Sequence, residues 1–391
     1  MNVAASHQVG EKLWSWASIV EEAAMAQARR ASEMPFVRPY LALMPDAHLG
    51  LGATVGSVIP TVGAIMPAAV GVDIGCGMIA LRTQFTRQQV AGHAPLSRLR
   101  REIERAIPLS AGHDNARISD TARARVAHLE SIAPRDYGVT AGRHDWRLQL
   151  GTLGSGNHFI EVTVDELDRV WLFLHSGSRG IGNRIAGEHI RQAQRESAAG
   201  LPDRDLAYLT EGTATFDAYI ADLNWAQQFA LLNREEMMDR VVRQMSEFMG
   251  EPVIAAERIN CHHNFTQREE HFGETVWLSR KGAIQADTGR PGLVPGSMGT
   301  ASYVVVGLGN AAAFCSSPHG AGRNLSRNAA RKRFSTADLR RAMHGIEYRD
   351  TSAFLDEHPG AYKDIDVVMR DASDLVAIRH TLHQIVNVKG D

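Results

Sequence analysis

Cysteine is scarce in this sequence, and its pattern excludes two common uses of the residue. The three cysteines, Cys76, Cys261 and Cys315, lie far apart, are odd in number and form no Cys-x-x-Cys pair. A disulfide framework or a zinc ribbon needs paired cysteines at characteristic spacing, so neither is indicated. Unpaired thiols are typical of a reducing compartment, and we therefore expect a cytoplasmic protein.

The sequence also lacks a surplus of positive charge and a long hydrophobic run. Its 42 Lys and Arg residues against 44 Asp and Glu give a formal net charge of −2, so any contact with a polyanion must come from a local basic patch. The most apolar run, residues 64–81, contains Pro67, Asp73 and several glycines, which predicts a buried strand–turn–strand rather than a membrane span. Residues 1–7 show no signal-peptide pattern. No membrane contact is expected.

No internal repeat or low-complexity linker divides the chain, so residues 1–391 are expected to form one domain. Within it, residues 184–250 read as long helices, and the stretch 216–249 has apolar residues at helical spacing with neither Pro nor Gly. Further helices are predicted at residues 11–33, within 97–131, and at 321–334, 336–344 and 371–386. Strands are predicted at residues 40–44, 55–62, 78–82, 158–162, 170–175 and within 276–308. The pattern indicates an α+β fold with central mixed or antiparallel sheets and an inserted helical segment.

Twelve of the histidines fall into two groups. Four of the 17 occur in glycine- or asparagine-rich turns next to strands: His158, His175, His263 and His319. Polar side chains at strand ends, flanked by residues that allow close backbone approach, suit a metal or phosphate site. Others have no motif around them and are expected on exposed helices in surface or packing roles: His7, His93, His113, His128, His344, His358, His380 and His383.

Asp73 and Cys76 form a fifth element of this kind, in Gly71-Val72-Asp73-Ile74-Gly75-Cys76-Gly77. An ionised carboxylate in so apolar a run is costly unless a cation pairs with it, and a metal ion would stabilise a thiolate as well. A lone cysteine is more often a small core residue, and a lone buried histidine is usually just hydrogen-bonded. The recurrence of the setting favours a metal site. Cysteine and histidine suit zinc whereas aspartate suits harder ions such as manganese, so the residues leave the ion open.

Two glycine-containing loops have the character of phosphate-binding loops. Residues 295–299 (Pro-Gly-Ser-Met-Gly) and 319–322 (His-Gly-Ala-Gly) can offer backbone donors, and the second is predicted to open a helix whose dipole favours an anion. Along that helix Arg323, Arg327 and Arg331 would share one face and form a track for a polyanion. The alternative is an ordinary solvated basic face. Neither a Walker A sequence nor a dinucleotide-type Gly-x-Gly-x-x-Gly turn is convincing.

Seven motifs in order resemble the RtcB RNA ligase family, over a range from about Pro35 to Lys389. They are Met44-Pro45-Asp46-Ala47-His48-Leu49-Gly50, residues 71–77, Gly151-Thr152-Leu153-Gly154-Ser155-Gly156-Asn157-His158-Phe159, His175-Ser176-Gly177-Ser178-Arg179-Gly180, Asn260-Cys261-His262-His263-Asn264, residues 295–299 and His319-Gly320-Ala321-Gly322-Arg323. The resemblance implies the family's α+β fold around a site for two manganese ions and GTP. Two departures, Leu51 where many relatives carry lysine and Pro318 where serine is common, suggest a specialised paralogue.

By motif position the resemblance assigns roles to individual residues. The metal ligands would be Asp73, Cys76, His158, His175 and His263, with Cys76 bridging the ions. His319 would be the nucleophile that takes GMP from GTP, and Asp46 would also serve ligation. The guanylate pocket would be lined by Asn157, His158, Phe159, Ile160, Glu161, His263, Asn264, Pro295, Gly296, Ser297, Met298, Ser302, His319, Gly320, Ala321, Gly322 and Lys389. Arg179, Arg323 and Arg327 are candidate RNA contacts.

The implied activity is GTP-dependent RNA ligation in tRNA splicing or RNA repair. RNA 3′-phosphate or 2′,3′-cyclic phosphate ends would be joined to 5′-hydroxyl ends through a guanylylated histidine and an RNA-pp-G intermediate, with an activating protein factor as a further partner. Two alternatives stay open. The same ligands could serve a metal-dependent phosphoesterase that only opens cyclic phosphates, and the chain could be an RNA-binding paralogue that does not ligate.

Overall fold

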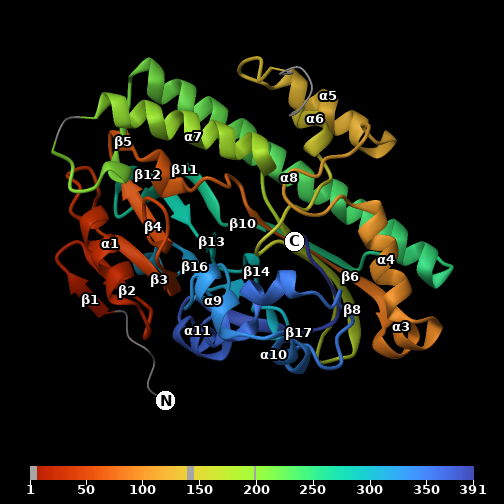
Figure 1. The fold of residues 1–391 in the computed structure, drawn as a ribbon. Helices are drawn as coiled ribbons and strands as arrows, with labels where there is room; N and C mark the ends of the chain where they lie inside the picture. Colours follow the sequence, from red (N-terminus) through yellow and green to blue (C-terminus); the bar gives the residue numbers. More distant parts are fainter. Residues whose placement is uncertain (1–6, 139–144, 198–199) are drawn as a thin grey trace.

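Two large β-sheets form the framework of the computed structural model, which describes residues 7–138, 145–197 and 200–391 (Figure 1). The first sheet has the strand order β1 (His7–Gly10), β2 (Leu13–Ser15), β3 (Leu41–His48), β4 (Val55–Thr61), β12 (Glu274–Lys281) and β11 (Asn264–His271). It is mixed, because β2 and β3 pair in parallel. The second has the order β10 (Glu257–His262), β6 (Gly77–Thr86), β8 (Arg169–Ser176), β7 (Phe159–Val164), β17 (Val376–Val388), β15 (Ser302–Gly307) and β14 (Pro291–Val294). All its pairings are antiparallel, so the predicted α+β class with mixed and antiparallel sheets is confirmed.

Two small ladders complete the strands. They are β13 (Ala283–Gln285) with β16 (Ser316–Pro318), and β5 (Ala64–Ile65) with β9 (Leu209–Thr210). Pro318 lies opposite Ala283 at the end of its ladder, a position where a residue without a backbone N–H is tolerated. The β13–β16 ladder therefore carries the chain directly into His319.

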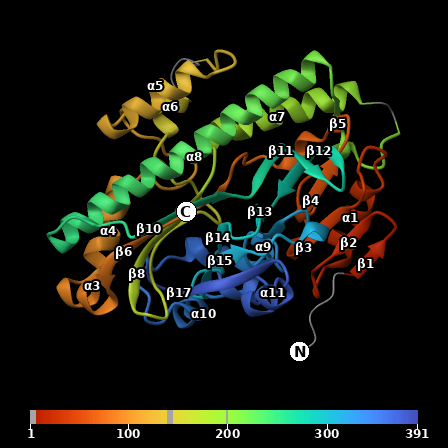
Figure 2. The same ribbon diagram turned by 180° about the vertical axis from the view of Figure 1, so that it is seen from behind.

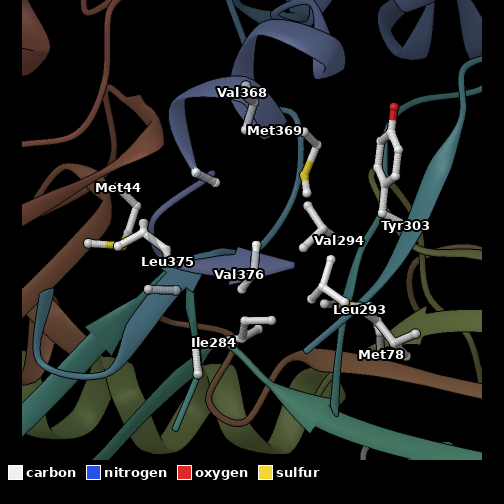
Figure 3. Close-up of a cluster of buried hydrophobic side chains, with 14 of the residues drawn as sticks. Met44, Met78, Ile284, Leu293, Val294, Tyr303, Val368, Met369, Leu375 and Val376 are labelled. Atoms are coloured by element: carbon white, nitrogen blue, oxygen red, sulfur yellow. The ribbon is translucent and has the colours of Figure 1, made fainter. Parts of the chain in front are cut away.

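The two sheets share a hydrophobic core, which Figure 3 shows in close-up. Met44 of the first sheet, Met78 and Leu293 of the second, and Ile284 of the small ladder all contribute fully buried side chains. Burial of such side chains contributes about 1.5–3 kcal/mol each. The core therefore fixes the two sheets against each other, and it also holds the loops at their junction in place.

Helix α8 (Ala214–Met249) is the longest element and runs diagonally across the molecule with α7 (Arg179–Glu196) alongside it, as both ribbon views show (Figures 1 and 2). It begins where Thr213 accepts a hydrogen bond from the Phe216 N–H, and ends at Gly250 in the left-handed conformation, the ordinary helix stop. One face buries Met237, Val241 and neighbouring residues against the second sheet. The long helices predicted within residues 184–250 are confirmed as α7 and α8, but residues 200–213 between them form no α-helix and contain a 3₁₀ turn and strand β9 (Leu209–Thr210).

The remaining helices are shorter. The α-helices are α1 (Glu22–Ser32), α2 (Pro67–Val70), α3 (Arg87–His93), α4 (Leu96–Ala106), α5 (Arg123–Ser131), α6 (Trp146–Gln149), α9 (Arg327–Arg333), α10 (Thr336–Ala342) and α11 (Ile365–Asp371). The 3₁₀ turns are η1 (Asp120–Ala122), η2 (Arg204–Leu206), η3 (Ala311–Ala313), η4 (Ser352–Glu357) and η5 (Pro359–Ala361). No helix in the described ranges is long and apolar enough to cross a membrane.

Several predicted boundaries are wrong. The helix expected at residues 11–33 begins only at Glu22, because Leu13–Ser15 pairs with β3. The helix expected at 371–386 is mostly strand β17, which pairs with β7 and β15 along its two edges and carries His380 and His383. The helix expected at 321–334 begins at Arg327. The expectation of no signal peptide concerns a segment whose residues 1–6 lie outside the described residues.

Candidate metal and nucleotide site

Five candidate metal donors meet where the two sheets join. Asp73 and Cys76 precede β6, His158 precedes β7, and His175 lies near the end of β8. Register brings them together, because Gly77 lies opposite both Ser176 and His262, and Phe159 lies opposite His175. His263 is the single residue between β10 of the second sheet and β11 of the first. Neighbouring strand ends therefore deliver donors that are far apart in sequence.

The donors form two overlapping groups of three, Cys76–His175–His263 and Asp73–Cys76–His158. The ligand atoms within each group lie within 4.8 Å of one another. Cys76 Sγ is 3.4 Å from His158 Nε2 and 3.3 Å from His175 Nε2. Since Cys76 belongs to both groups, the arrangement suits two cations that share the sulfur.

Hydrogen bonds to the opposite ring nitrogens aim the imidazoles inward. The Nδ1 atoms of His158 and His175 lie 2.9 and 3.2 Å from the carbonyl oxygens of Leu153 and Asn157, and His263 Nδ1 lies 3.3 Å from Asn264 Oδ1. Oxygen acceptors assign a proton to Nδ1, so the Nε2 atoms of His175 and His263 present lone pairs, the arrangement usual for a metal-binding histidine. His158 Nε2 lies 3.1 Å from Asp73 Oδ2. The Nε2 atoms of His175 and His263 are only 2.9 Å apart. Two lone pairs so close repel each other unless a cation lies between them, so the donor set fits a metal.

Two buried polar residues of helix α8 form hydrogen bonds with the loops that carry the donor cluster. Asn233 Oδ1 accepts hydrogen bonds from the N–H groups of Gly151 and Thr152, at 2.7 and 3.2 Å, and its Nδ2 donates to Gly177 O at 3.1 Å. Arg234 donates to Gly75 O at 2.7 Å and to Ser176 O at 3.2 Å. These bonds tie the loops that carry Asp73, Cys76, His158 and His175 to one rigid helix.

Burial sets the protonation of the cluster. Burial, followed by the charge of Asp73, raises the pKa of the Cys76 thiol well above its usual range. Burial and then neighbouring imidazoles hold the pKa values of His175 and His263 well below theirs. Burial alone would raise the pKa of Asp73, but the hydrogen bond and charge of His158, the hydrogen bond with Cys76 and the charge of Arg179 together outweigh burial and lower the pKa to about 2. The imidazoles of His175 and His263 are thus neutral, while the thiol needs a cation nearby to become a ligand.

His319 lies between this cluster and a pocket. Its ring centroid is 4.4 Å from that of His263, and its Nδ1 lies 2.6 Å from Oδ2 of the fully buried Asp46. The His319 N–H also donates to that oxygen at 3.1 Å. Lys363 donates to the carbonyl oxygens of Pro45 and Ala47 on either side of Asp46. Asp46 therefore lies against the Nδ1 side of the ring, and Nε2 is the ring nitrogen away from this carboxylate.

The pocket beside His319 is lined by most of the residues predicted for guanylate binding. These are Asn157, Phe159, Glu161, Pro295, Gly296, Ser297, Met298, Ser302, His319, Gly320, Ala321, Gly322 and Lys389, together with Arg323 and Arg327. Ile160 differs: its side chain is fully buried in the core on the opposite face of β7, because successive residues of a strand alternate sides. His158 and His263 lie in the donor cluster, where Asn264 donates to Asp73 O and accepts from the Gly282 N–H. Arg179 bonds Thr152 Oγ1 at 3.1 Å and does not line the pocket.

Three further pocket residues have no role in the predictions: His48, Glu357 and Tyr362. Glu357 is buried and receives hydrogen bonds from Lys389 Nζ at 3.2 Å and from the Tyr362 hydroxyl at 2.6 Å. Burial would raise the pKa of Glu357, but the charge of Lys389 and of two arginines lowers it to about 2. Glu357 therefore orients Lys389. Its sequence context, Leu-Asp-Glu-His-Pro, carries no motif that could have revealed this, whereas His48 lies within the motif of residues 44–50.

The arginine stripe is less open than the sequence predicts. Arg323 and Arg327 pair with Glu357 at 3.2 and 2.5 Å, and Arg331 pairs with Asp356 at 2.9 Å. Residues 319–322 do not open a helix, so the expected helix-dipole contribution at that loop is wrong. The stripe is largely neutralised, although Arg323 and Arg327 still line the pocket.

Comparison with known proteins gives one consistent result. Residues 27–390 match the family model described as "tRNA-splicing ligase RtcB". The chain is 47% identical over 402 residues to the "RNA-splicing ligase RtcB" of Escherichia coli (strain K12), covering 97% of each chain. It is 30% identical to the "tRNA-splicing ligase RtcB" of Nanoarchaeum equitans, over 96% of this chain and 92% of the relative. It is 32% identical to the "RNA-splicing ligase RtcB" of Mycobacterium tuberculosis, over 83% and 90% respectively.

Proposed function

The chain belongs to the RtcB family of tRNA-splicing ligases, and from this premise we propose how it acts as an RNA ligase. We infer that it joins RNA 3′-phosphate or 2′,3′-cyclic phosphate ends to 5′-hydroxyl ends, with GTP as the energy source, in tRNA splicing or RNA repair. The observation that carries the proposal is the position of His319, whose ring touches the donor cluster on one side and the pocket on the other.

His319 is the nucleophile in this proposal. With Nδ1 beside Asp46, Nε2 is the nitrogen free to attack the α-phosphorus of GTP. The new N–P bond replaces the bond to pyrophosphate, which leaves, and Asp46 stabilises the positive charge that develops on the ring. A 3′-phosphate oxygen of the RNA then takes GMP from Nε2. The 5′-hydroxyl of the second RNA end finally attacks the activated 3′-phosphorus and releases GMP. A cyclic phosphate must first be opened by water to the 3′-phosphate.

Asp73, Cys76, His158, His175 and His263 would hold two metal ions. Divalent ions supply neutralisation of charge on phosphate oxygens during each transfer. Three imidazoles, a thiolate and a carboxylate suit several first-row ions, and the family resemblance favours manganese. Ser302 and Lys389, with the loop 295–298, would contact the nucleotide. Three free cysteines support a cytoplasmic site of action, and an activating protein factor is a further proposed partner.

The test is covalent labelling by GTP that carries a label on its α-phosphate. We expect the protein to become labelled in the presence of Mn²⁺ and the His319→Ala variant to remain unlabelled. His344→Ala is the matched control, because His344 is exposed at the end of α10. Full labelling of His319→Ala would refute the assignment. Turnover of a 2′,3′-cyclic phosphate without GTP, and without joined product, would instead support the phosphoesterase alternative.

A further inference from the structure

A second, strongly basic depression lies outside the site described above. It is lined by helix α4, the loop 107–119, η1 and helix α8, and its charged lining residues are Arg105, Arg117, Asp120, Arg123 and Arg243. Its volume is about 680 Å³. We call this depression the arginine pocket.

Three of its arginines have no carboxylate partner. Arg123 pairs with Asp120 at 2.9 Å, but Arg105, Arg117 and Arg243 form no ion pair within the described ranges. Close by, in contrast, Arg125 is paired with both Glu236 and Asp239. Three unpaired charges of one sign around a concave surface focus a positive potential.

The walls of the arginine pocket are held rigidly. Arg240, 5% exposed, donates to Ala106 O, Asn115 Oδ1, Gly151 O and Ser119 Oγ at 2.9–3.3 Å. Its Nε also donates to the fully buried Glu236 at 2.9 Å. A buried ion pair thus fixes both ends of the loop 107–119 against α8. The unpaired arginines therefore project from a preformed surface.

Short links connect this surface to the nucleotide pocket. Pro108, in the wall of the arginine pocket, accepts a hydrogen bond from the Leu153 N–H, and Leu153 O accepts one from His158 Nδ1. On a second path, the Asp391 N–H donates to Ser110 Oγ at 3.0 Å. Asp391 follows Lys389, which lines the nucleotide pocket, by two residues. Two residues span at most about 7 Å, so the chain that follows Lys389 reaches the loop 107–119 within a short distance of the nucleotide pocket. Both ribbon views place the C-terminus between α5 and α9 (Figures 1 and 2).

We propose that the arginine pocket binds backbone phosphates of the RNA substrate a few nucleotides from the reacting ends. This rests on the proposed function, because the reacting ends must lie beside His319. Unpaired guanidinium groups on a rigid surface suit successive phosphates, which they bind without reading sequence. The chain's net charge of −2 gives no general attraction for RNA, so a local patch of this kind must supply it.

The experiment compares two triple variants of equal charge. Arg105→Gln/Arg117→Gln/Arg243→Gln removes the unpaired arginines, and Arg29→Gln/Arg204→Gln/Arg268→Gln removes three exposed arginines at α1, η2 and β11. Binding and ligation are measured over a range of salt. Nicked RNAs with arms of about four or about sixteen nucleotides are compared, since sites for single strands typically cover that range.

For the first variant and the long-arm RNA we expect the slope of log affinity against log salt to flatten by about 2, or roughly 0.7 for each lost phosphate contact. KM should rise about tenfold at low salt with kcat unchanged, because the contact is equal in the ground and transition states. Short-arm RNA and labelling by GTP should be unaffected. Equal losses in both triple variants, or no loss in either, would contradict RNA binding in the arginine pocket. Labelling by GTP in the same proteins would show that the proposed function still holds. Absent labelling in all proteins would instead refute the proposed function.

Discussion

Glu161 gives the nucleotide pocket a testable pH dependence through its carboxyl group. Glu161 is buried, Asn387 donates to one of its oxygens at 2.8 Å, and its other oxygen has no partner within the described residues. Burial raises the pKa of Glu161 to about 8, although the charge of Lys389 opposes this. Near neutral pH the free protein therefore carries Glu161 mainly as the neutral acid.

A guanine base offers an amino group as a donor, next to a ring N–H, and an ionised carboxylate can accept from both. Binding of GTP should then release a proton, so its affinity should rise with pH up to about 8 and level off above it, by at most about tenfold per pH unit. Titration calorimetry with a non-hydrolysable GTP analogue measures this. Glu161→Gln should flatten the profile and reduce the preference for GTP over ATP by roughly tenfold or more. A flat profile in the unmodified protein would contradict the prediction.

Single residues also show which parts of the site can be predicted from the sequence. Cys76 and His319 stand in glycine-rich motifs, and such motifs are visible without a structure. Glu357 and Tyr362 were missed because they act through Lys389 and Arg327, residues that approach them only in the folded chain. Ile160 was included because its neighbours on β7 line the pocket, but strand alternation turns it into the core.

Among the elements, helix α8 has the most direct influence on the donor cluster. Asn233 bonds the loop before His158 and the loop after His175, and it is fully buried. Asn233→Ala would leave the N–H groups of Gly151 and Thr152 unsatisfied and free the two loops to move. We expect Mn²⁺ affinity to fall about 10- to 100-fold, the usual effect of losing a residue that orients metal ligands, with all five donors still present.

Asn224→Ala is the matched control for this prediction, since Asn224 lies exposed on the same helix. Its Mn²⁺ affinity should equal that of the unmodified protein in equilibrium dialysis, and both variants should keep the same far-ultraviolet circular dichroism. An Asn233→Ala protein with unchanged Mn²⁺ affinity would show that the loops hold their geometry without α8.

Element prediction succeeded where local signals agree with tertiary packing and failed where pairing overrides them. Helix α8 was predicted because its residues keep helical spacing between Thr213 and Gly250. The sequence of strand β17 predicts a helix, because Leu375, Ile378, Leu382 and Ile385 recur at helical spacing. Hydrogen bonds to β7 and β15 on both edges, together with the β-branched run near Val388, decide in favour of strand. Such pairing is non-local and cannot be seen in a window of sequence.

On the scale of the whole molecule, the donor cluster depends on both sheets being assembled. His263 links the second sheet to the first, and Asp46 of β3 reaches His319 from the first sheet. The motifs identified the donors, but their convergence requires the shared core around Met44, Ile284 and Leu293. The prediction that residues 1–391 form one domain stays a prediction. An unfolded chain cannot present the donors together, so binding of a cation must favour the folded state.

Metal binding should therefore raise the stability of the protein, independently of any catalysis. With Mn²⁺ at about 100 times its dissociation constant, the folded state gains about 2.7 kcal/mol, which a thermal-shift titration detects as a rise in unfolding temperature that a chelator reverses. Cys76→Ala should abolish most of this rise, because Cys76 belongs to both groups of donors. Cys315→Ala should keep it, since Cys315 belongs to neither. If Cys76→Ala were stabilised by Mn²⁺ as much as Cys315→Ala, the ion would have to bind elsewhere, and the sulfur shared by the two groups would have no part in holding it.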